Sequence, residues 1–116
     1  MKSRLEGYWE IFEVHKDGKR IKSYTINMNI DYFELITDST GYRKKVSPTL
    51  DGKYIVNDHQ TPFFISVKDN KLIIRYQDQG VEYEEIILEV EDELLRIKNE
   101  QGFVYSYRPY EPIEIE

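Results

Sequence analysis

The chain has 116 residues, a net charge of −6 and no cysteine. This length fits one domain, which we expect to span residues 1–116 with a C-terminal tail over 109–116. The missing cysteines exclude disulfides, thiolate metal sites and a cysteine nucleophile. The negative charge argues against nucleic acid as a partner, and no apolar run reaches the roughly 20 residues that span a bilayer as a helix.

The composition and the turn signals both favour strands. The chain has ten Tyr and no Ala, and Tyr favours sheet whereas Ala favours helix. Turn signals rich in Asp, Asn and Gly recur at residues 16–19, 38–41, 51–52, 68–71, 77–80, 91–92 and 99–102. Runs of about eight to twelve residues between turns are typical of consecutive hairpins. The sequence therefore predicts an all-β fold, an antiparallel up-and-down meander, and this spacing fits either a sandwich or a meander that closes into a small barrel of eight or nine strands.

Several of these runs alternate between apolar and polar residues, as half-buried strands do. The clearest is 24–30, where Tyr24, Ile26, Met28 and Ile30 share one face. The same alternation covers 63–67, 72–76 and 103–107. We expect the apolar face of each run to point into the barrel.

The run Val81–Val90 breaks this alternation, because its apolar residues change face half-way along. A one-residue bulge near Glu84-Glu85 would return them all to one face and would bend the strand, as barrel closure requires. The alternative is a strand that is apolar on both faces.

Two motifs at the chain ends carry a family resemblance. Gly7-x-Trp9 begins the first predicted strand, and Arg108 lies on the last. This pairing resembles the lipocalin family, in particular the short lipocalin-like domains of Bacteroidetes envelope proteins. The resemblance implies that Trp9 closes the bottom of the barrel, that Arg108 lies across its indole ring, and that Gly7 lets the backbone pass closely. Such a cation–π contact contributes about 0.5–2 kcal/mol.

A barrel of eight strands is filled by its own side chains or holds one small ligand. The predicted interior residues are Trp9, Ile26, Met28, Phe63, Ile65, Tyr76, Tyr83, Leu88 and Tyr105. Two interpretations stay open for this set: an apolar pocket with tyrosine hydroxyls as orienting groups, or a solid core.

No other motif indicates catalysis, a metal site or a cofactor. His15 and His59 lack the further ligands of a zinc site, and the sequence has neither a Gly-x-Ser-x-Gly motif nor a Gly-rich phosphate loop. The acidic stretch over 82–93 is expected to be a solvated strand face that blunts edge-to-edge pairing.

These observations predict a non-enzymatic lipocalin-like domain that binds a small hydrophobic or amphipathic molecule in the barrel mouth. The alternative is a protein-interaction or inhibitor module that uses the barrel as a rigid scaffold, with exposed aromatic residues such as Tyr8, Tyr42, Tyr54, Phe64 and Tyr110. The expected cellular compartment depends on whether Met1 is the native N-terminus. We expect a periplasmic or envelope lipoprotein if a signal precedes Met1, and a cytoplasmic protein if Met1 is the native start.

Overall fold

The computed structural model describes residues 2–24, 30–48 and 54–110, with the side chains of 4–24, 30–46 and 60–110. Nearly all of these residues belong to strands, and one short 3-10 turn precedes the first strand. In chain order the elements are η1 (Lys2–Leu5), β1 (Gly7–Lys16), β2 (Lys19–Ser23), β3 (Ile30–Leu35), β4 (Thr40–Pro48), β5 (Tyr54–Lys68), β6 (Lys71–Asp78), β7 (Val81–Val90), β8 (Leu95–Lys98) and β9 (Phe103–Pro109).

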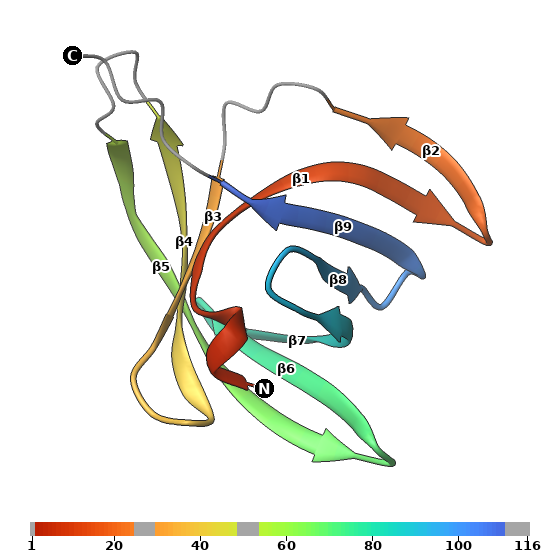
Figure 1. The fold of residues 1–116 in the computed structure, drawn as a ribbon. Helices are drawn as coiled ribbons and strands as arrows, with labels where there is room; N and C mark the ends of the chain where they lie inside the picture. The colour runs from red at the N-terminus through yellow and green to blue at the C-terminus, as the bar shows by residue number, and fades with distance from the viewer. Residues whose placement is uncertain (1, 25–29, 49–53, 111–116) are drawn as a thin grey trace.

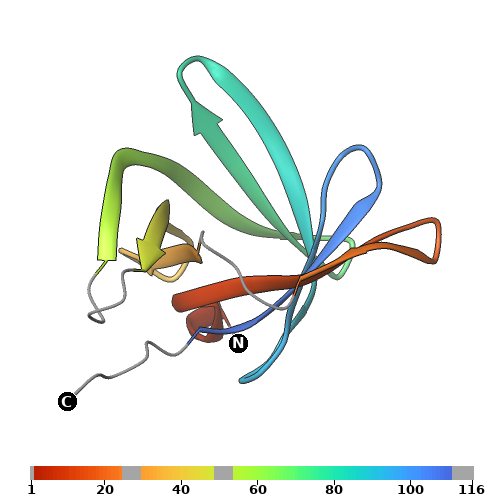
Figure 2. The same ribbon diagram turned by 90° about the horizontal axis from the view of Figure 1, so that it is seen from above.

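The strands close into a barrel. The sheet order is β2-β1-β3-β4-β5-β6-β7-β8-β9, every pairing is antiparallel, and β1 also pairs with β9. Strands β1 and β3–β9 therefore form a closed ring of eight. Strand β2 is an extra strand, paired with the C-terminal part of β1. Figures 1 and 2 show β1 and β9, the first and last strands, side by side. The predicted meander barrel is confirmed.

Tight turns set the register of three hairpins, at positions that the sequence predicts. In each turn both central residues have positive φ, as a type I′ hairpin turn requires. These pairs are Asp17-Gly18 (53° and 77°), Asp69-Asn70 (52° and 63°) and Gln79-Gly80 (50° and 83°). Because the turn type and loop length fix the register of a hairpin, these local residues specify how the two strands of each hairpin align.

The bulge in β7 lies elsewhere than predicted. The β6–β7 register runs without a shift through Glu84 and Glu85, so the predicted bulge at these residues is wrong. The irregularity lies on the β8 side, between Ile87 and Glu89. Leu88, predicted to line the interior, occupies this bulge and is 46% exposed. The inner face of β7 therefore keeps Glu85, a carboxylate that apolar alternation does not predict inside a barrel.

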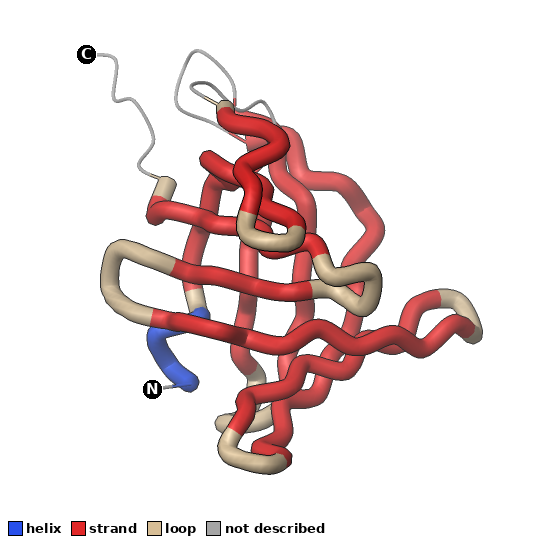
Figure 3. Tube along the Cα trace, turned by 90° about the vertical axis from the view of Figure 1, so that its right-hand side faces the viewer, coloured by secondary structure: helices blue, strands red, loops and turns tan. Residues whose placement is uncertain are grey.

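A packed cluster fills one part of the barrel, and we call it the base. Its buried members are Leu5, Trp9, Phe33, Phe63, Ile65, Ile74, Tyr76, Ile87, Val90, Leu95, Ile97 and Tyr107. Turn η1 joins it from outside the ring of strands, as the ribbon and tube views show (Figures 1 and 3). Leu5 of this turn is buried, and its carbonyl oxygen accepts a 2.9 Å hydrogen bond from the indole Nε1 of Trp9.

Gly7 and Gly41 are required for two different physical reasons. Gly7 has φ +138°, a conformation that side chains rarely adopt, and a Cβ there would meet no atom within 4 Å. Its role is conformational, so the close backbone approach implied by the resemblance is wrong. Close approach occurs instead at Gly41, where a Cβ would clash with the carbonyl oxygen of Glu34 and the ring of Phe63.

Candidate ligand-binding site

The predicted interior residues divide into four groups. Trp9, Phe63, Ile65 and Tyr76 are at most 4% exposed and belong to the packed base. Tyr83 and Tyr105 are partly buried beside that base, whereas Leu88 is exposed. Ile26 and Met28, with most of the predicted strand 24–30, lie outside the described residues.

The barrel interior is open beside the base, where a pocket of about 470 Å³ has mostly polar lining. We call this pocket the mouth. Its lining residues are Ile11, Tyr24, Asp31, Arg43, Lys45, Glu85, Asn99, Tyr105 and Tyr107. The mouth is thus far more polar than the predicted apolar pocket, and among the described residues it shares Tyr105 alone with the predicted lining.

Arg43 of β4 occupies the boundary between the mouth and the base. Its Nη1 donates to the Tyr76 hydroxyl at 2.7 Å and to Glu85 Oε1 at 3.0 Å. Its Nη2 donates to Asp31 Oδ2 at 3.1 Å and to the Tyr107 hydroxyl at 3.1 Å. We call these five residues the Arg43 cluster. The four acceptors come from β3, β6, β7 and β9, so one side chain connects strands from around the whole barrel.

Aromatic rings and a second cation complete the surroundings of this guanidinium. Its carbon lies 4.9 Å from the centre of the Phe33 ring and 5.6 Å from that of Tyr76, within cation–π range. Tyr76 in turn stacks on Tyr83, with ring centres 4.9 Å apart. On the open side, Lys45 Nζ lies 3.1 Å from Asp31 Oδ1. The positive charge of Arg43 is therefore stabilised by the ring faces of Phe33 and Tyr76 and by the carboxylates of Asp31 and Glu85.

The electrostatics favour charged carboxylates and neutral phenols. Burial alone would raise the pKa of Asp31, but Arg43 and Lys45 outweigh that effect and hold this pKa below its ordinary value. Burial alone would lower the pKa of Arg43, yet the phenols and carboxylates around it raise that pKa well above the ordinary value. Burial raises the pKa of both Tyr76 and Tyr107. At neutral pH the two phenols therefore keep their protons and can donate them.

The third phenol of interest, Tyr105, is oriented by a turn. Asn99 Oδ1 accepts hydrogen bonds from the backbone N–H groups of Gln101 at 3.1 Å and Phe103 at 2.9 Å. Its Nδ2 then donates to the Tyr105 hydroxyl at 3.3 Å. The β8–β9 turn thus positions both an amide and a phenol at the mouth. Within the described residues, no group of three or more His, Cys, Asp and Glu is placed to hold a metal ion.

Comparison with known proteins agrees with this architecture. The family model of the lipocalin-like domain matches residues 5–97. The chain belongs to this lipocalin-like family. No match is found among curated proteins. In the part of the chain that the structure describes, no helix has the length and apolar character to cross a membrane.

Solved structures show the same fold at low identity. A lipocalin-like protein from Bacteroides uniformis is 15% identical, with 92% of this chain and 99% of the other covered and a TM-score of 0.53. An uncharacterized protein from Bacteroides eggerthii is 16% identical, with 91% of this chain and 99% of the other covered and a TM-score of 0.54. Lobster apocrustacyanin A1 is 11% identical, with 93% of this chain and 62% of the other covered and a TM-score of 0.50. Such identities show the lipocalin-like fold alone.

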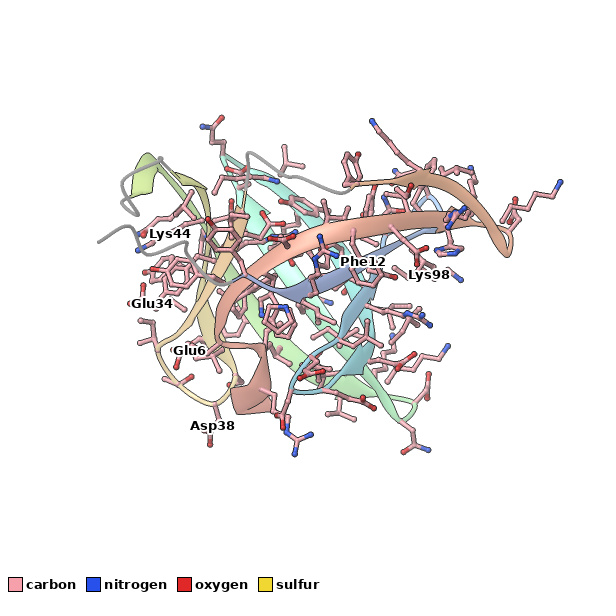
Figure 4. The ribbon with its side chains drawn as sticks, turned by 45° about the horizontal axis from the view of Figure 1, so that its top comes forward. Glu6, Phe12, Glu34, Asp38, Lys44 and Lys98 are labelled. Atoms are coloured by element: carbon pink, nitrogen blue, oxygen red, sulfur yellow. The ribbon has the colours of Figure 1, made fainter. Side chains whose placement is uncertain are left out.

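The contact implied by the lipocalin resemblance, Arg108 across the Trp9 indole, is wrong, although the adjacency of their strands is confirmed. Arg108 is opposite Glu10 in the β1–β9 register, and successive residues of a strand face opposite sides of the sheet. Its Nε therefore donates to Glu10 Oε1 at 2.8 Å on the outer face. Its guanidinium lies 5.7 Å from the ring centre of Phe12, a residue labelled in Figure 4. Trp9 is buried on the inner face.

A second hollow lies on the outside of this lipocalin-like barrel. Its volume is about 330 Å³, and its lining includes Ile36, Tyr42, Pro62, Phe64 and Arg75. Ile36 is 60% exposed and Phe64 is 63% exposed. Of the aromatic residues predicted for the alternative function, a protein-interaction module, Tyr42 and Phe64 line this outer hollow.

Sequence reasoning missed Asp31, Arg43 and Glu85, the charged residues of the Arg43 cluster. Apolar alternation predicts that charged residues face water, so it assigns these three side chains to the outside. One local signal pointed inward: Asp31 shares its strand face with Phe33, which is fully buried.

Proposed function

We propose that this lipocalin-like domain is a non-enzymatic binder of one small amphipathic molecule, held in the mouth. The lipocalin-like fold commonly binds small hydrophobic ligands, and it is typically a binder rather than an enzyme. The observation that carries the proposal is the mouth itself, about 470 Å³ and bounded by the Arg43 cluster. This volume lies within the roughly 300–1,000 Å³ of ligand pockets. The lining is more polar than that of most such pockets, and Ile11 and Tyr24 supply its apolar part.

The packed base argues against a ligand deeper in the barrel. Phe33, Ile74 and Tyr76 have no exposed surface, and Phe63 packs edge-on against both Phe33 and Tyr76. A ligand there would have to displace buried side chains, at a cost of several kcal/mol. Binding in the mouth requires no such rearrangement.

Titration with Nile red, an uncharged solvent-sensitive dye, tests the proposal. We expect a saturable blue shift with one dye per chain. Ile11→Trp adds an indole to the mouth from β1 and should weaken dye binding at least tenfold, because the added ring occupies the dye's volume. Phe64→Ser is the matched control, since it removes the main apolar side chain of the outer hollow from a site that is already 63% exposed.

Either of two results would overturn the proposal. Nile red that fails to saturate would show that the mouth is not a binding site. Dye binding lost in Phe64→Ser but kept in Ile11→Trp would move the site to the outer hollow. That second outcome would favour the alternative function, an interaction module that uses the barrel as a scaffold.

A further inference from the structure

The guanidinium of Arg43 has little left to offer an anion. A guanidinium carries four N–H bonds on its two terminal nitrogens. Nη1 donates to Tyr76 and Glu85, and Nη2 donates to Asp31 and Tyr107. A ligand carboxylate would therefore have to replace one of these partners before it reached the forked donor geometry that arginine ordinarily presents.

The charges of the mouth also disfavour an anionic head group. Asp31 and Glu85 have side chains only 7% and 12% exposed, and they flank one buried cation, Arg43. The second cation, Lys45, is 63% exposed, so water screens its charge more strongly. The inner wall of the mouth thus carries two buried negative charges against one buried positive charge. A third anion, brought by a ligand, would be repelled by Asp31 and Glu85.

What the mouth offers is a pair of phenol hydrogens. The Tyr105 hydroxyl accepts from Asn99 Nδ2, and the Tyr107 hydroxyl accepts from Arg43 Nη2. Among the described residues, neither hydroxyl has an acceptor for its own hydrogen. Residues two apart on a strand share a face, about 7 Å from one another. Tyr105 and Tyr107 can therefore donate to two oxygen atoms of one ligand head group.

We infer that the ligand of the mouth has an uncharged head group rich in oxygen acceptors, as in a glycerol ester, and not a carboxylate or a quaternary ammonium. This inference rests on the proposed function and names its ligand class. An ester or a hydroxyl accepts from the phenols without bringing a charge next to Asp31 and Glu85. A quaternary ammonium supplies no acceptor at all. The apolar part of the ligand would lie against Ile11 and the Tyr24 ring, which also line the mouth.

The experiment compares three twelve-carbon amphiphiles that differ only in their head groups. Each displaces Nile red from the wild-type protein at pH 7.5, below its micelle concentration: 1-monolaurin, dodecanoate and dodecyltrimethylammonium. We expect 1-monolaurin to displace the dye at a concentration at least tenfold below that of either charged amphiphile. Dodecanoate or dodecyltrimethylammonium acting at an equal or lower concentration would overturn the inference, while leaving the proposed function intact. If Nile red itself does not bind, the proposed function fails.

One hydroxyl deletion tests the stated contact. Tyr105→Phe removes an O–H donor and keeps the ring, so the affinity for 1-monolaurin should fall about fivefold, the effect of one hydrogen bond. The affinity for dodecanoate should change less than twofold. Tyr42→Phe is the matched control, because Tyr42 lines the outer hollow, and it should leave both affinities unchanged. An unchanged 1-monolaurin affinity in Tyr105→Phe would overturn the assignment of the phenols as head-group donors.

Discussion

The base and the mouth of this barrel are built on the same strands, yet they differ in almost every physical property. On β3, Phe33 is fully buried in the base, whereas Asp31, two residues away on the same face, lines the mouth. On β7, Ile87 belongs to the base and Glu85 to the mouth. A step of two residues along an inner face thus separates an apolar core from an ionic cluster. Strand alternation decides which side chains point inward, but not what chemistry they bring.

The two regions also differ in what they contribute to stability. Burial of apolar surface in the base stabilises the fold by roughly 25 cal/mol per Å². The Arg43 cluster contributes much less net stability, because desolvation of its charges offsets most of their attraction. Its three charged residues, Asp31, Arg43 and Glu85, depend on one another, however, because removal of one partner leaves an uncompensated buried charge. The base therefore holds the barrel together, and the mouth is available for recognition.

The largest expected effect is in the base. Trp9→Ala removes a buried ring and its hydrogen bond to Leu5, and should lower the free energy of unfolding by about 3–5 kcal/mol. Urea unfolding followed by circular dichroism measures this. Phe64→Ala is the control and should cost less than about 0.5 kcal/mol, because Phe64 is exposed. Equal losses for the two variants would contradict the base as the stabilising region.

Next is the Arg43 cluster. Arg43→Met leaves the carboxylates of Asp31 and Glu85 without their shared partner, and should cost about 3 kcal/mol in the same measurement. Adding Asp31→Asn and Glu85→Gln to Arg43→Met removes both stranded charges. We expect the triple variant to be more stable than Arg43→Met alone. A triple variant that is less stable would show that the charges are not the source of the loss.

The pH dependence gives a smaller, graded effect. Because the native pKa of Asp31 is lowered, its contribution to stability is complete above the unfolded-state value of about 4 and is lost as the pH falls from there through the native pKa. Asp31→Asn keeps a similar shape without the charge, so its stability should fall less steeply below pH 4. Parallel urea titrations between pH 2.5 and 7 compare the two proteins. Identical slopes would contradict the assigned role of Asp31.

The smallest expected effect is at Arg108. Because it pairs with Glu10 on the exposed side of the barrel, Arg108→Met should change the free energy of unfolding by less than about 1 kcal/mol. The fluorescence of Trp9, the single tryptophan, should be unaltered. A shifted emission maximum would instead indicate that the guanidinium does contact the indole in solution.

Much of the fold could be predicted from the sequence, because its signals are local. Asp17-Gly18 adopts the positive φ values that such pairs favour in tight hairpin turns, and the hairpin follows from it. The regular spacing of such turns fitted a barrel or a sandwich, and the resemblance carried by Gly7-x-Trp9 and Arg108 favoured the barrel. The register within β7 could not, because the bulge at Leu88 depends on pairing with β8, a tertiary contact.

The mouth was far less predictable. Its polar lining is an exception to the rule that charged side chains face water. Arg43 can point into the barrel because Asp31 and Glu85, on other strands, compensate its charge. No local pattern records that arrangement. Among the described residues, Tyr105 alone of the predicted lining lies in the mouth, because the rule selected apolar residues and most of these lie in the base.

The central claim is that a ligand occupies the mouth and leaves the base undisturbed. Proton–nitrogen NMR spectra recorded during a titration with 1-monolaurin test this most directly. We predict that the backbone amide signals of Asn99 and Tyr105 in the mouth shift with saturation, while the single indole N–H signal, that of Trp9, stays in place. A shift of the indole signal with unchanged mouth signals would place the ligand in the base and would contradict the account.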